Sequence, residues 1–354
     1  FKGCDDMKIL KFMLLFVPIS FIGKFLNFSP TIMFILAALS IIPLAGIMGE
    51  GTEEISSYTG PKIGGFLNAT FGNATELIIS FFALKSGLFE VVKSSIAGSI
   101  IGNILLVLGA SMFIGGLKHK TQNFNINVVE TTSSMLLFSL IGLCVPAFFF
   151  FSINPNLLNT RYEGLSLVVA IVMFILYILS LIFSFFTHKD LYATTTEEEG
   201  HESKWSLKKS IIILVIATVI IAIESEFLVG GIEDITSKLG LSEFFVGIIL
   251  IPIIGNAAEH STAITMALKN KMDVAIEIAL GSSLQIILFV APVLIFLSLL
   301  FTPMSIIFNP FELVSLIASV IIANKVASDG QSNWLEGAQL MAVYFIIAAG
   351  FFIL

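Results

Sequence analysis

"FGNATELIIS", residues 71–80, and "IGNAAEHSTA", residues 254–263, carry the same Gly, Asn, Ala and Glu at the same spacing. Each stretch lies inside a long apolar part of the chain. A carboxylate at the centre of a bilayer costs at least about 2.5 to 3.5 kcal/mol, so a glutamate is rare there without a partner or a function. Two glutamates at matching positions, Glu76 and Glu259, therefore predict one cavity that uses both.

The composition identifies the solvent of this protein. Hydrophobic residues make up 56% of the 354 residues and charged residues only 12%, whereas soluble domains average about 25% charged residues. The apolar residues form eleven long, continuous segments, which predicts an all-α membrane protein with about 11 transmembrane helices rather than a β-barrel. The net charge of −7 argues against a nucleic-acid partner. The segments lie near 7–28, 30–49, 63–84, 88–117, 126–151, 161–187, 208–231, 242–268, 271–301, 310–327 and 333–354.

The two motifs belong to an internal repeat. The second motif follows the first by 183 positions, and Gly98 and Ser99 recur at the same offset as Gly281 and Ser282. Segments two to six therefore repeat as segments seven to eleven. Because five is odd, the second group must enter the membrane from the opposite side, which predicts one extra N-terminal helix followed by two inverted five-helix repeats. The expected parts are an N-terminal helix at 1–29, a first repeat at 30–187, an acidic linker at 188–207 and a second repeat at 208–354.

Basic residues set the expected orientation. With the N-terminus inside, thirteen of the 18 Lys and Arg residues fall on the cytoplasmic side, where basic residues of short loops accumulate. We therefore expect a cytoplasmic N-terminus, an external C-terminus and a cytoplasmic linker. The expected location is the plasma membrane.

The residues around each glutamate suit a hard cation. In each motif the asparagine precedes the glutamate by three positions, which places the amide and the acid on one helix face. Each motif also begins with a glycine, where a kink would free backbone carbonyl oxygens. Carboxylate, amide and carbonyl oxygens favour Ca²⁺, Mg²⁺ or Mn²⁺ over softer metals. The predicted ligands are the glycine, asparagine and glutamate of both motifs: Gly72, Asn73, Glu76, Gly255, Asn256 and Glu259.

A Gly-Ser segment follows each motif, "AGSIIGN" at 97–103 and "LGSSLQ" at 280–285. Two interpretations stay open. Small residues allow close helix packing in membranes, or the polar side chains supply oxygens or waters to the cation site. The candidate secondary ligands are Ser99, Asn103, Ser282 and Gln285.

These residues resemble those of a transporter family. "GNATEL" at 72–77 and "GNAAEH" at 255–260, each followed by a Gly-Ser segment, are similar to the paired repeats of the cation/proton exchangers, the Ca²⁺/H⁺ antiporter branch of the cation/Ca²⁺ exchanger superfamily. The resemblance spans nearly the whole chain. It implies that Glu76 and Glu259 carry both Ca²⁺ and protons, with the glycine carbonyls and asparagines of the motifs around them. It also implies a secondary transporter rather than an enzyme, with Ca²⁺ as substrate and no cofactor.

Antiport follows from the charges of such a site. Two close carboxylates repel each other, and Ca²⁺ and protons compete for their oxygens. With an inward-directed proton gradient, this competition at a site opened alternately to each side exports Ca²⁺ from the cytoplasm. The main alternative is the same architecture coupled to Na⁺ or K⁺, and a cation channel is a weaker one, because one acid per inverted half suits alternating access. The expected partners are Ca²⁺, H⁺ and the lipid bilayer, and a homo-oligomer stays open.

The acidic segment "TTTEEEGHESKW", residues 194–205, resembles the acidic linker of that family. One hypothesis is a weak cytoplasmic patch that collects Ca²⁺ or regulates transport. The alternative is a solvated linker without a specific function, since charge runs are usually disordered. The acids of this patch are Glu197, Glu198, Glu199 and Glu202.

Acidic, glycine-containing stretches end segments two and seven, at 47–60 and 224–240. Their acids are interpreted either as solvated helix ends or as the lining of vestibules that lead to the two motif glutamates. The glycines offer bending points. We therefore hypothesise that segments two and seven shift against a steadier core of segments three, four, eight and nine.

Overall fold

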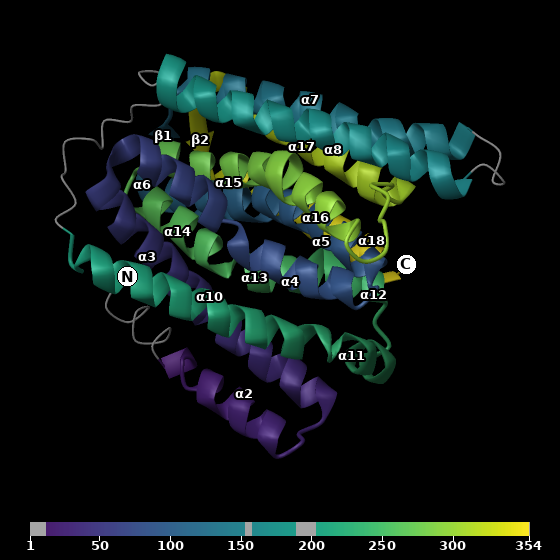
Figure 1. Cartoon of the computed structure of the whole chain (residues 1–354). Helices are drawn as coiled ribbons and strands as arrows, with labels where there is room; N and C mark the ends of the chain where they lie inside the picture. Colours follow the sequence, from purple (N-terminus) through teal and green to yellow (C-terminus); the bar gives the residue numbers. More distant parts are fainter. Residues whose placement is uncertain (1–11, 153–157, 189–202, 354) are drawn as a thin grey trace. The chain divides into compact units, whose positions relative to one another are not determined.

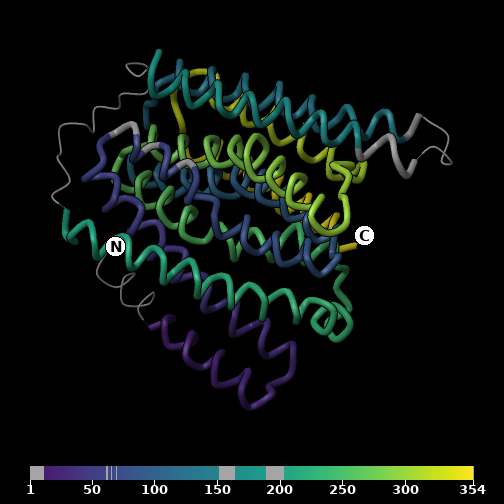
Figure 2. The backbone as a smooth tube through the Cα atoms, in the orientation of Figure 1, coloured from purple at the N-terminus to yellow at the C-terminus, as the bar shows by residue number. Residues whose placement is uncertain are grey.

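The computed structural model describes residues 12–152, 158–188 and 203–353, and these residues are almost entirely helical (Figure 1, Figure 2). The predicted all-α class is therefore confirmed. Two strands in this part of the chain, β1 (Thr121–Asn123) and β2 (Gln331–Asn333), form one short antiparallel pair. The α-helices are α2 (Phe16–Phe25), α3 (Pro30–Phe71), α4 (Ala74–Lys85), α5 (Phe89–Ile101), α6 (Leu108–His119), α7 (Ile126–Ser152), α8 (Leu158–Ile182), α10 (Leu207–Val229), α11 (Ile232–Leu239), α12 (Glu243–Phe245), α13 (Ile251–Gly255), α14 (Ala257–Leu268), α15 (Met272–Gln285), α16 (Ala291–Ser298), α17 (Pro310–Val326) and α18 (Trp334–Ile353). Short π-helical turns are η1 (Gly102–Val107), η3 (Phe183–Thr187), η5 (Val246–Leu250) and η6 (Ile286–Val290), and η7 (Ala327–Asp329) is a 3₁₀ turn.

Eight helices of the described chain are long and apolar enough to cross a membrane, and a bent pair would make a ninth. The chain is therefore an integral, multi-pass membrane protein. The bent pair joins Ile232–Leu239 to Glu243–Gly255 at an angle of 118°. Eleven spans were expected, and two of the expected segments, 63–84 and 242–268, are not single helices. Both are broken inside the Gly-Asn motif.

The chain divides into two compact units, and each is described by itself. Unit one contains Phe1–Val91 and Gly200–Ala258, and unit two contains Val92–Glu199 and Glu259–Leu354. Each unit therefore takes one stretch from the first half of the sequence and one from the second half.

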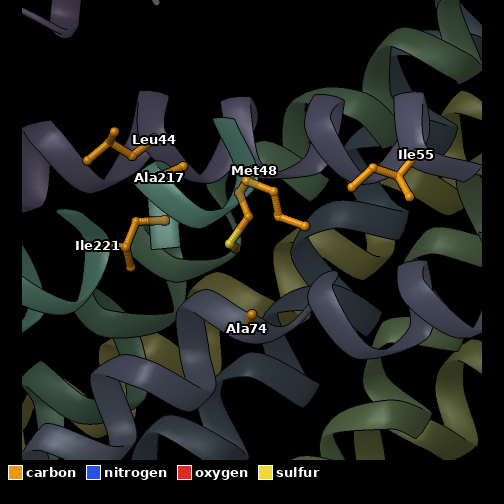
Figure 3. Packing of buried hydrophobic residues seen from close by; sticks show 7 residues of the cluster. Leu44, Met48, Ile55, Ala74, Ala217 and Ile221 are labelled. Atoms are coloured by element: carbon orange, nitrogen blue, oxygen red, sulfur yellow. The ribbon is translucent and has the colours of Figure 1, made fainter. Parts of the chain in front are cut away.

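The core of unit one forms where α3 packs along α10 (Figure 3). Met48 of α3 and Ile221 of α10 are almost fully buried in this cluster. Because lipid tails are as apolar as these side chains, close packing and hydrogen bonds hold membrane helices together more than the hydrophobic effect does. The buried members of the cluster are Leu44, Met48, Ile55, Ala74, Leu214, Ala217 and Ile221.

Hydrogen bonds to carboxylates hold the start of α3 and the residues just before α10. At the start of α3, Asp234 of α11 accepts the Thr31 N–H at 2.9 Å and also the Thr31 hydroxyl. Just before the start of α10, Glu54 of α3 accepts the Trp205 N–H at 3.0 Å. A carboxylate near a helix N-terminus is favoured by the helix dipole. These two acids come from the stretches interpreted as solvated ends or vestibules, and both bind backbone amides.

In unit two, α6 and α18 cross with their backbones in contact. A Cβ atom on Gly337 would lie 2.2 Å from the backbone N of Phe113, and one on Gly116 would lie 2.3 Å from the backbone N of Trp334. Only glycine fits so close a crossing, which is common between membrane helices. The β1–β2 pair lies next to this crossing in the chain, because β1 follows α6 and β2 precedes α18.

Candidate functional site

The first motif lies in unit one, at a break between two helices. α3 ends at Phe71 and α4 begins at Ala74, and between them Asn73 departs from helical geometry, with φ −99° and ψ 17°. The preceding Gly72 keeps helical angles, and its N–H still donates to the Asn68 carbonyl at 2.8 Å. The kink that the sequence analysis placed at the glycine is therefore centred on the asparagine.

Glu76 lies in the first turn of α4, directly after this break. Its side chain is 5% exposed, and Asn73 is fully buried. The N-terminus of a helix is the positive end of its dipole and favours a negative charge. Glu76 is thus held at the start of a helix rather than in the middle of a continuous span.

The second motif repeats this local structure. α13 ends at Gly255, Asn256 has φ −90° and ψ 6°, and α14 begins at Ala257. The Asn256 side chain donates from Nδ2 to the Pro252 carbonyl at 3.1 Å, beside the bond from its own backbone N–H at 2.9 Å. Glu259 lies in the first turn of α14. Both motifs therefore fold as a helix, a break at asparagine and a glutamate in the next first turn.

Within unit one, the glutamate of the first motif meets the glycine of the second. A Cβ atom on Gly255 would lie 3.2 Å from both Cγ and Oε1 of Glu76. These distances are shorter than the roughly 3.5 to 4.0 Å of a comfortable carbon contact. Gly255 therefore leaves space for the carboxylate of Glu76, a role that the sequence analysis did not assign to it.

In unit two, Glu259 begins a chain of hydrogen bonds. Ser282 Oγ of α15 donates to Glu259 Oε2 at 2.7 Å, and Asn103 Nδ2 of η1 donates to Ser282 Oγ at 3.1 Å. Asn103 and Ser282 are both buried. The structure thus brings two of the four candidate secondary residues to the second motif glutamate.

The other two candidates, Ser99 and Gln285, lie near Asn103 and Ser282 in the sequence. Ser99 is buried in α5, one turn before Asn103, and Gln285 is half-buried at the end of α15. A π-helical turn includes Asn103, and another begins directly after Gln285. Such turns are frequent at functional sites. Nothing in the apolar pattern of the sequence indicated them.

Two glycines of these segments, Gly102 and Gly281, do not serve close packing. A Cβ atom on Gly102 or Gly281 would meet no described atom within 4 Å. The tight helix crossing of unit two uses Gly116 and Gly337 instead. The packing interpretation is therefore wrong for Gly102 and Gly281, because their neighbours leave room for a larger side chain.

Glu224 begins the acidic stretch 224–240, whose acids the sequence analysis interprets as solvated helix ends or as vestibule lining, but the structure buries it. Glu224 of α10 has no exposed surface, and its Oε1 accepts a hydrogen bond from the Ser20 hydroxyl of α2. Its Oε2 has no hydrogen-bond partner among the described residues. The available signal was an acid inside the apolar segment 208–231, but unlike Glu76 it has no counterpart 183 positions away.

Neutral groups would have to complete any cation site. Within the described ranges, no three His, Cys, Asp or Glu side chains are placed to hold a metal ion together. A hard cation also accepts hydroxyl, amide and carbonyl oxygens, which both motifs provide. The acids of the predicted linker patch, Glu197, Glu198, Glu199 and Glu202, lie outside the described residues.

Known proteins resemble this chain over almost its whole length. The family model described as "Sodium/calcium exchanger protein" matches residues 29–186 and 209–353. A Ca(2+)/H(+) antiporter of Aphanothece halophytica is 47% identical over 355 residues, which cover 96% of this chain and 95% of that protein. The Ca(2+)/H(+) antiporter ChaA of Bacillus subtilis is also 47% identical, covering 96% of this chain and 97% of that protein. The structure of native YfkE matches with a TM-score of 0.86 and 42% identity, covering 98% of this chain and 100% of that chain.

Proposed function

Because this chain belongs to the sodium/calcium exchanger protein family, we propose that it exchanges Ca²⁺ for H⁺ across the membrane. Its relatives named as Ca²⁺/H⁺ antiporters share nearly half of its residues over almost its full length. The resemblance to the cation/proton exchangers is confirmed by these matches. The protein is a secondary transporter, and Ca²⁺ is its substrate rather than a resident cofactor.

One observation carries the assignment of the site. Each motif glutamate lies in the first turn of a helix that begins directly after a break at asparagine. Glu76 and Glu259 bind Ca²⁺ and protons in turn, because Ca²⁺ needs the ionised carboxylates and a proton removes the charge that holds the cation. The remaining ligands are the amides of Asn73 and Asn256 and carbonyl oxygens at Gly72 and Gly255.

The hydrogen-bonded chain in unit two supports a role for the secondary residues. Ser282 and Asn103 orient the carboxylate of Glu259 through the bonds at 2.7 Å and 3.1 Å. Ser99 and Gln285 supply further oxygens, directly or through water. The acids of the 188–207 linker form a weak Ca²⁺-collecting patch at the cytoplasmic side.

The proposed topology has one extra N-terminal helix at 1–29 and two inverted five-helix repeats at 30–187 and 208–354, with eleven spans in all. Three observations support it. The family model matches once in each proposed repeat, the asparagine breaks at 73 and 256 lie 183 positions apart, and the π turns at Gly102–Val107 and Ile286–Val290 recur at nearly the same offset. The N-terminus is cytoplasmic and the C-terminus external, in the plasma membrane, so that an inward proton gradient exports Ca²⁺ from the cytoplasm.

The test is Ca²⁺ flux into proteoliposomes under an imposed pH gradient. We expect Glu76→Gln and Glu259→Gln each to lower the flux to that of empty liposomes while the protein stays folded. Glu90→Gln, which removes an exposed acid in the first turn of α5, is the matched control and keeps the flux of the unmodified protein. Normal flux in either motif variant would show that the substituted glutamate does not carry Ca²⁺ and protons.

The ion on the other side of the exchange is tested in the same vesicles. A pH gradient alone should drive Ca²⁺ flux, and a Na⁺ or K⁺ gradient at equal pH should not. If a Na⁺ or K⁺ gradient drives the Ca²⁺ flux and the pH gradient does not, the protein exchanges Ca²⁺ for Na⁺ or K⁺ rather than for H⁺.

A further inference from the structure

An apolar groove runs along the outside of unit one, where α2, α3 and α10 meet. It has a volume of ≈ 310 Å³, and every residue that lines it is apolar. Leu44 of α3 and Ala217 of α10 are its buried lining residues, whereas Ile216 of α10 is 52% exposed. Since α3 and α10 are both long enough to cross the membrane, the groove opens toward hydrocarbon rather than water.

A single stripe of α10 forms one side of the groove. Ile213, Ile216, Ala217 and Ile220 all line it, at the spacing of one helix face. One turn before Ile213 the same stripe carries Lys209, which is exposed. The apolar groove therefore has a positive charge at one end.

An aromatic side chain accompanies that charge. Lys209 Nζ lies 4.9 Å from the centre of the Trp205 ring. Tryptophan and lysine together are typical of the level of the lipid headgroups, where an amphipathic ring and a charged amine both meet water and lipid. This end of the groove has the composition of a membrane interface.

The distance from Lys209 to the far end of the groove matches one leaflet. From Lys209 to Ile220 the helix α10 advances about 16 Å at about 1.5 Å per residue. The hydrocarbon core of a bilayer is about 30 Å thick, so that one leaflet is roughly half of this. A chain that enters beside Lys209 and follows the groove therefore ends near the middle of the membrane.

We propose that this groove binds one acyl chain of an anionic phospholipid, whose phosphate-bearing headgroup lies at Lys209 and Trp205. The apolar lining accepts the acyl chain, and the lysine selects a negatively charged headgroup over a neutral one. The lipid packs between the N-terminal helix α2 and the α3 and α10 pair. This site is separate from Glu76 and Glu259 and is independent of which ions the protein exchanges.

The test measures lipid binding by the full chain purified in detergent. Thermal unfolding is followed while phosphatidylglycerol or phosphatidylcholine with identical acyl chains is added, because a ligand of the folded state raises the unfolding midpoint with its concentration. We expect phosphatidylglycerol to act at lower concentrations than phosphatidylcholine. Lys209→Gln should weaken the apparent affinity for phosphatidylglycerol about fivefold, the effect of one lysine near an anionic lipid, and Lys209→Arg should retain it.

The chain offers a matched control for the charge. Lys208 is also exposed but lies about 100° around the helix from Lys209. Lys208→Gln should therefore leave the affinity for phosphatidylglycerol unchanged. Equal losses in the two glutamine variants would mean unspecific attraction by surface charge and would overturn the proposal, as would equal action of the two lipids on the unmodified protein.

A second pair of variants tests the groove itself. Ile216→Phe places a larger side chain in the groove, whereas Val215→Phe enlarges a neighbouring side chain that is 56% exposed and does not line it. Native mass spectrometry should show retained phosphatidylglycerol on the unmodified protein and on the Val215 variant, and at least about fivefold less on the Ile216 variant, the effect of overpacking. Equal retention on both variants would show that the acyl chain does not lie in this groove. Because both positions are exposed, both variants are expected to fold.

Discussion

Gly255 and Glu76 show how one missing side chain shapes the proposed site. A Cβ atom on Gly255 would lie 3.2 Å from Cγ and Oε1 of Glu76. We expect Gly255→Ala to push this carboxylate out of position by a few tenths of an ångström. Overpacking costs about 1 to 3 kcal/mol, and the lower end of this range predicts an approximately fivefold weaker apparent Ca²⁺ affinity, measured as the Ca²⁺ dependence of proton-driven flux.

The matched control for this change is Gly281→Ala. A Cβ atom on Gly281 would meet no described atom within 4 Å, and alanine is favoured over glycine in a helix interior by about 0.5 to 1 kcal/mol. The control should transport normally and unfold at a slightly higher temperature. An equal loss of affinity in both variants would show that the contact with Glu76 is not the cause.

Ser282 is expected to matter through its bond to Glu259. Ser282→Ala removes the donor at 2.7 Å from Glu259 Oε2 and the acceptor of the Asn103 amide. A hydrogen bond to a charged group contributes about 1.5 to 3 kcal/mol, so the apparent Ca²⁺ affinity should fall about tenfold or more. Ser282→Thr, which keeps the hydroxyl, should restore most of it.

Ser283→Ala is the control for the neighbouring hydroxyl. Ser283 is buried too, but its hydroxyl donates to the Ala279 carbonyl within α15. Flux measured over a range of Ca²⁺ concentrations should be unchanged in this variant. If both alanine variants lose affinity equally, the effect comes from the packing of α15 and not from the bond to Glu259.

Single residues were predictable to different degrees. The chemistry of Glu76 and Glu259 could be inferred because an acid in an apolar segment has few explanations. The contact of Gly255 with Glu76 could not, since it joins positions far apart in the chain and glycine has several other uses in membrane helices. Asn103 and Ser282 could be proposed as polar candidates, but only their distances single them out from Ser99 and Gln285.

Among the elements, the broken helices depart most from the expected pattern. Segments 63–84 and 242–268 are continuous apolar runs in the sequence, yet the chain leaves the helix at Asn73 and again at Asn256. Intrinsic preferences differ by only about 1 kcal/mol between glycine and alanine, too little to fix the position of a break. At Asn256 the side-chain amide bonds to the Pro252 carbonyl, which stabilises the break one residue after the glycine.

Because Asp234 binds the start of α3 and Glu54 binds the backbone just before α10, we expect these helices to behave as one element. In the unmodified protein, a carboxylate oxygen of Asp234 contacts the Thr31 N–H at 2.9 Å and the Lys238 amine at 2.8 Å. Asp234→Asn removes the charge of this side chain and weakens both contacts. We expect the midpoint of thermal unfolding to fall by no more than a few degrees, and less at high salt, because the pair is partly exposed and screened. Glu233→Gln removes the neighbouring exposed acid and should leave the midpoint unchanged. A fall of the same size in both variants would point to net charge rather than to the contact with α3.

At the scale of the whole molecule, composition was sufficient for the fold class and the membrane location. Long apolar segments have one physical solution in a bilayer, which is the helix. The sequence did not reveal the two compact units, because their division depends on contacts between distant segments. The hypothesis that segments two and seven shift against a steadier core of segments three, four, eight and nine stays a prediction.

The composition of the two units has a consequence for the order in which the protein is made. Unit one needs residues from both Phe1–Val91 and Gly200–Ala258, so α3 lacks its α10 partner until the ribosome has passed the middle of the chain. A fragment that ends in the 188–207 linker should therefore be unstable when expressed alone. Expressed with the remaining fragment, it should copurify as a transport-active complex, since each fragment supplies half of both units. Folding is thus expected to be completed only after translation of the second half. Until then, the newly synthesised first half depends on the insertion machinery to shield its unpaired helices.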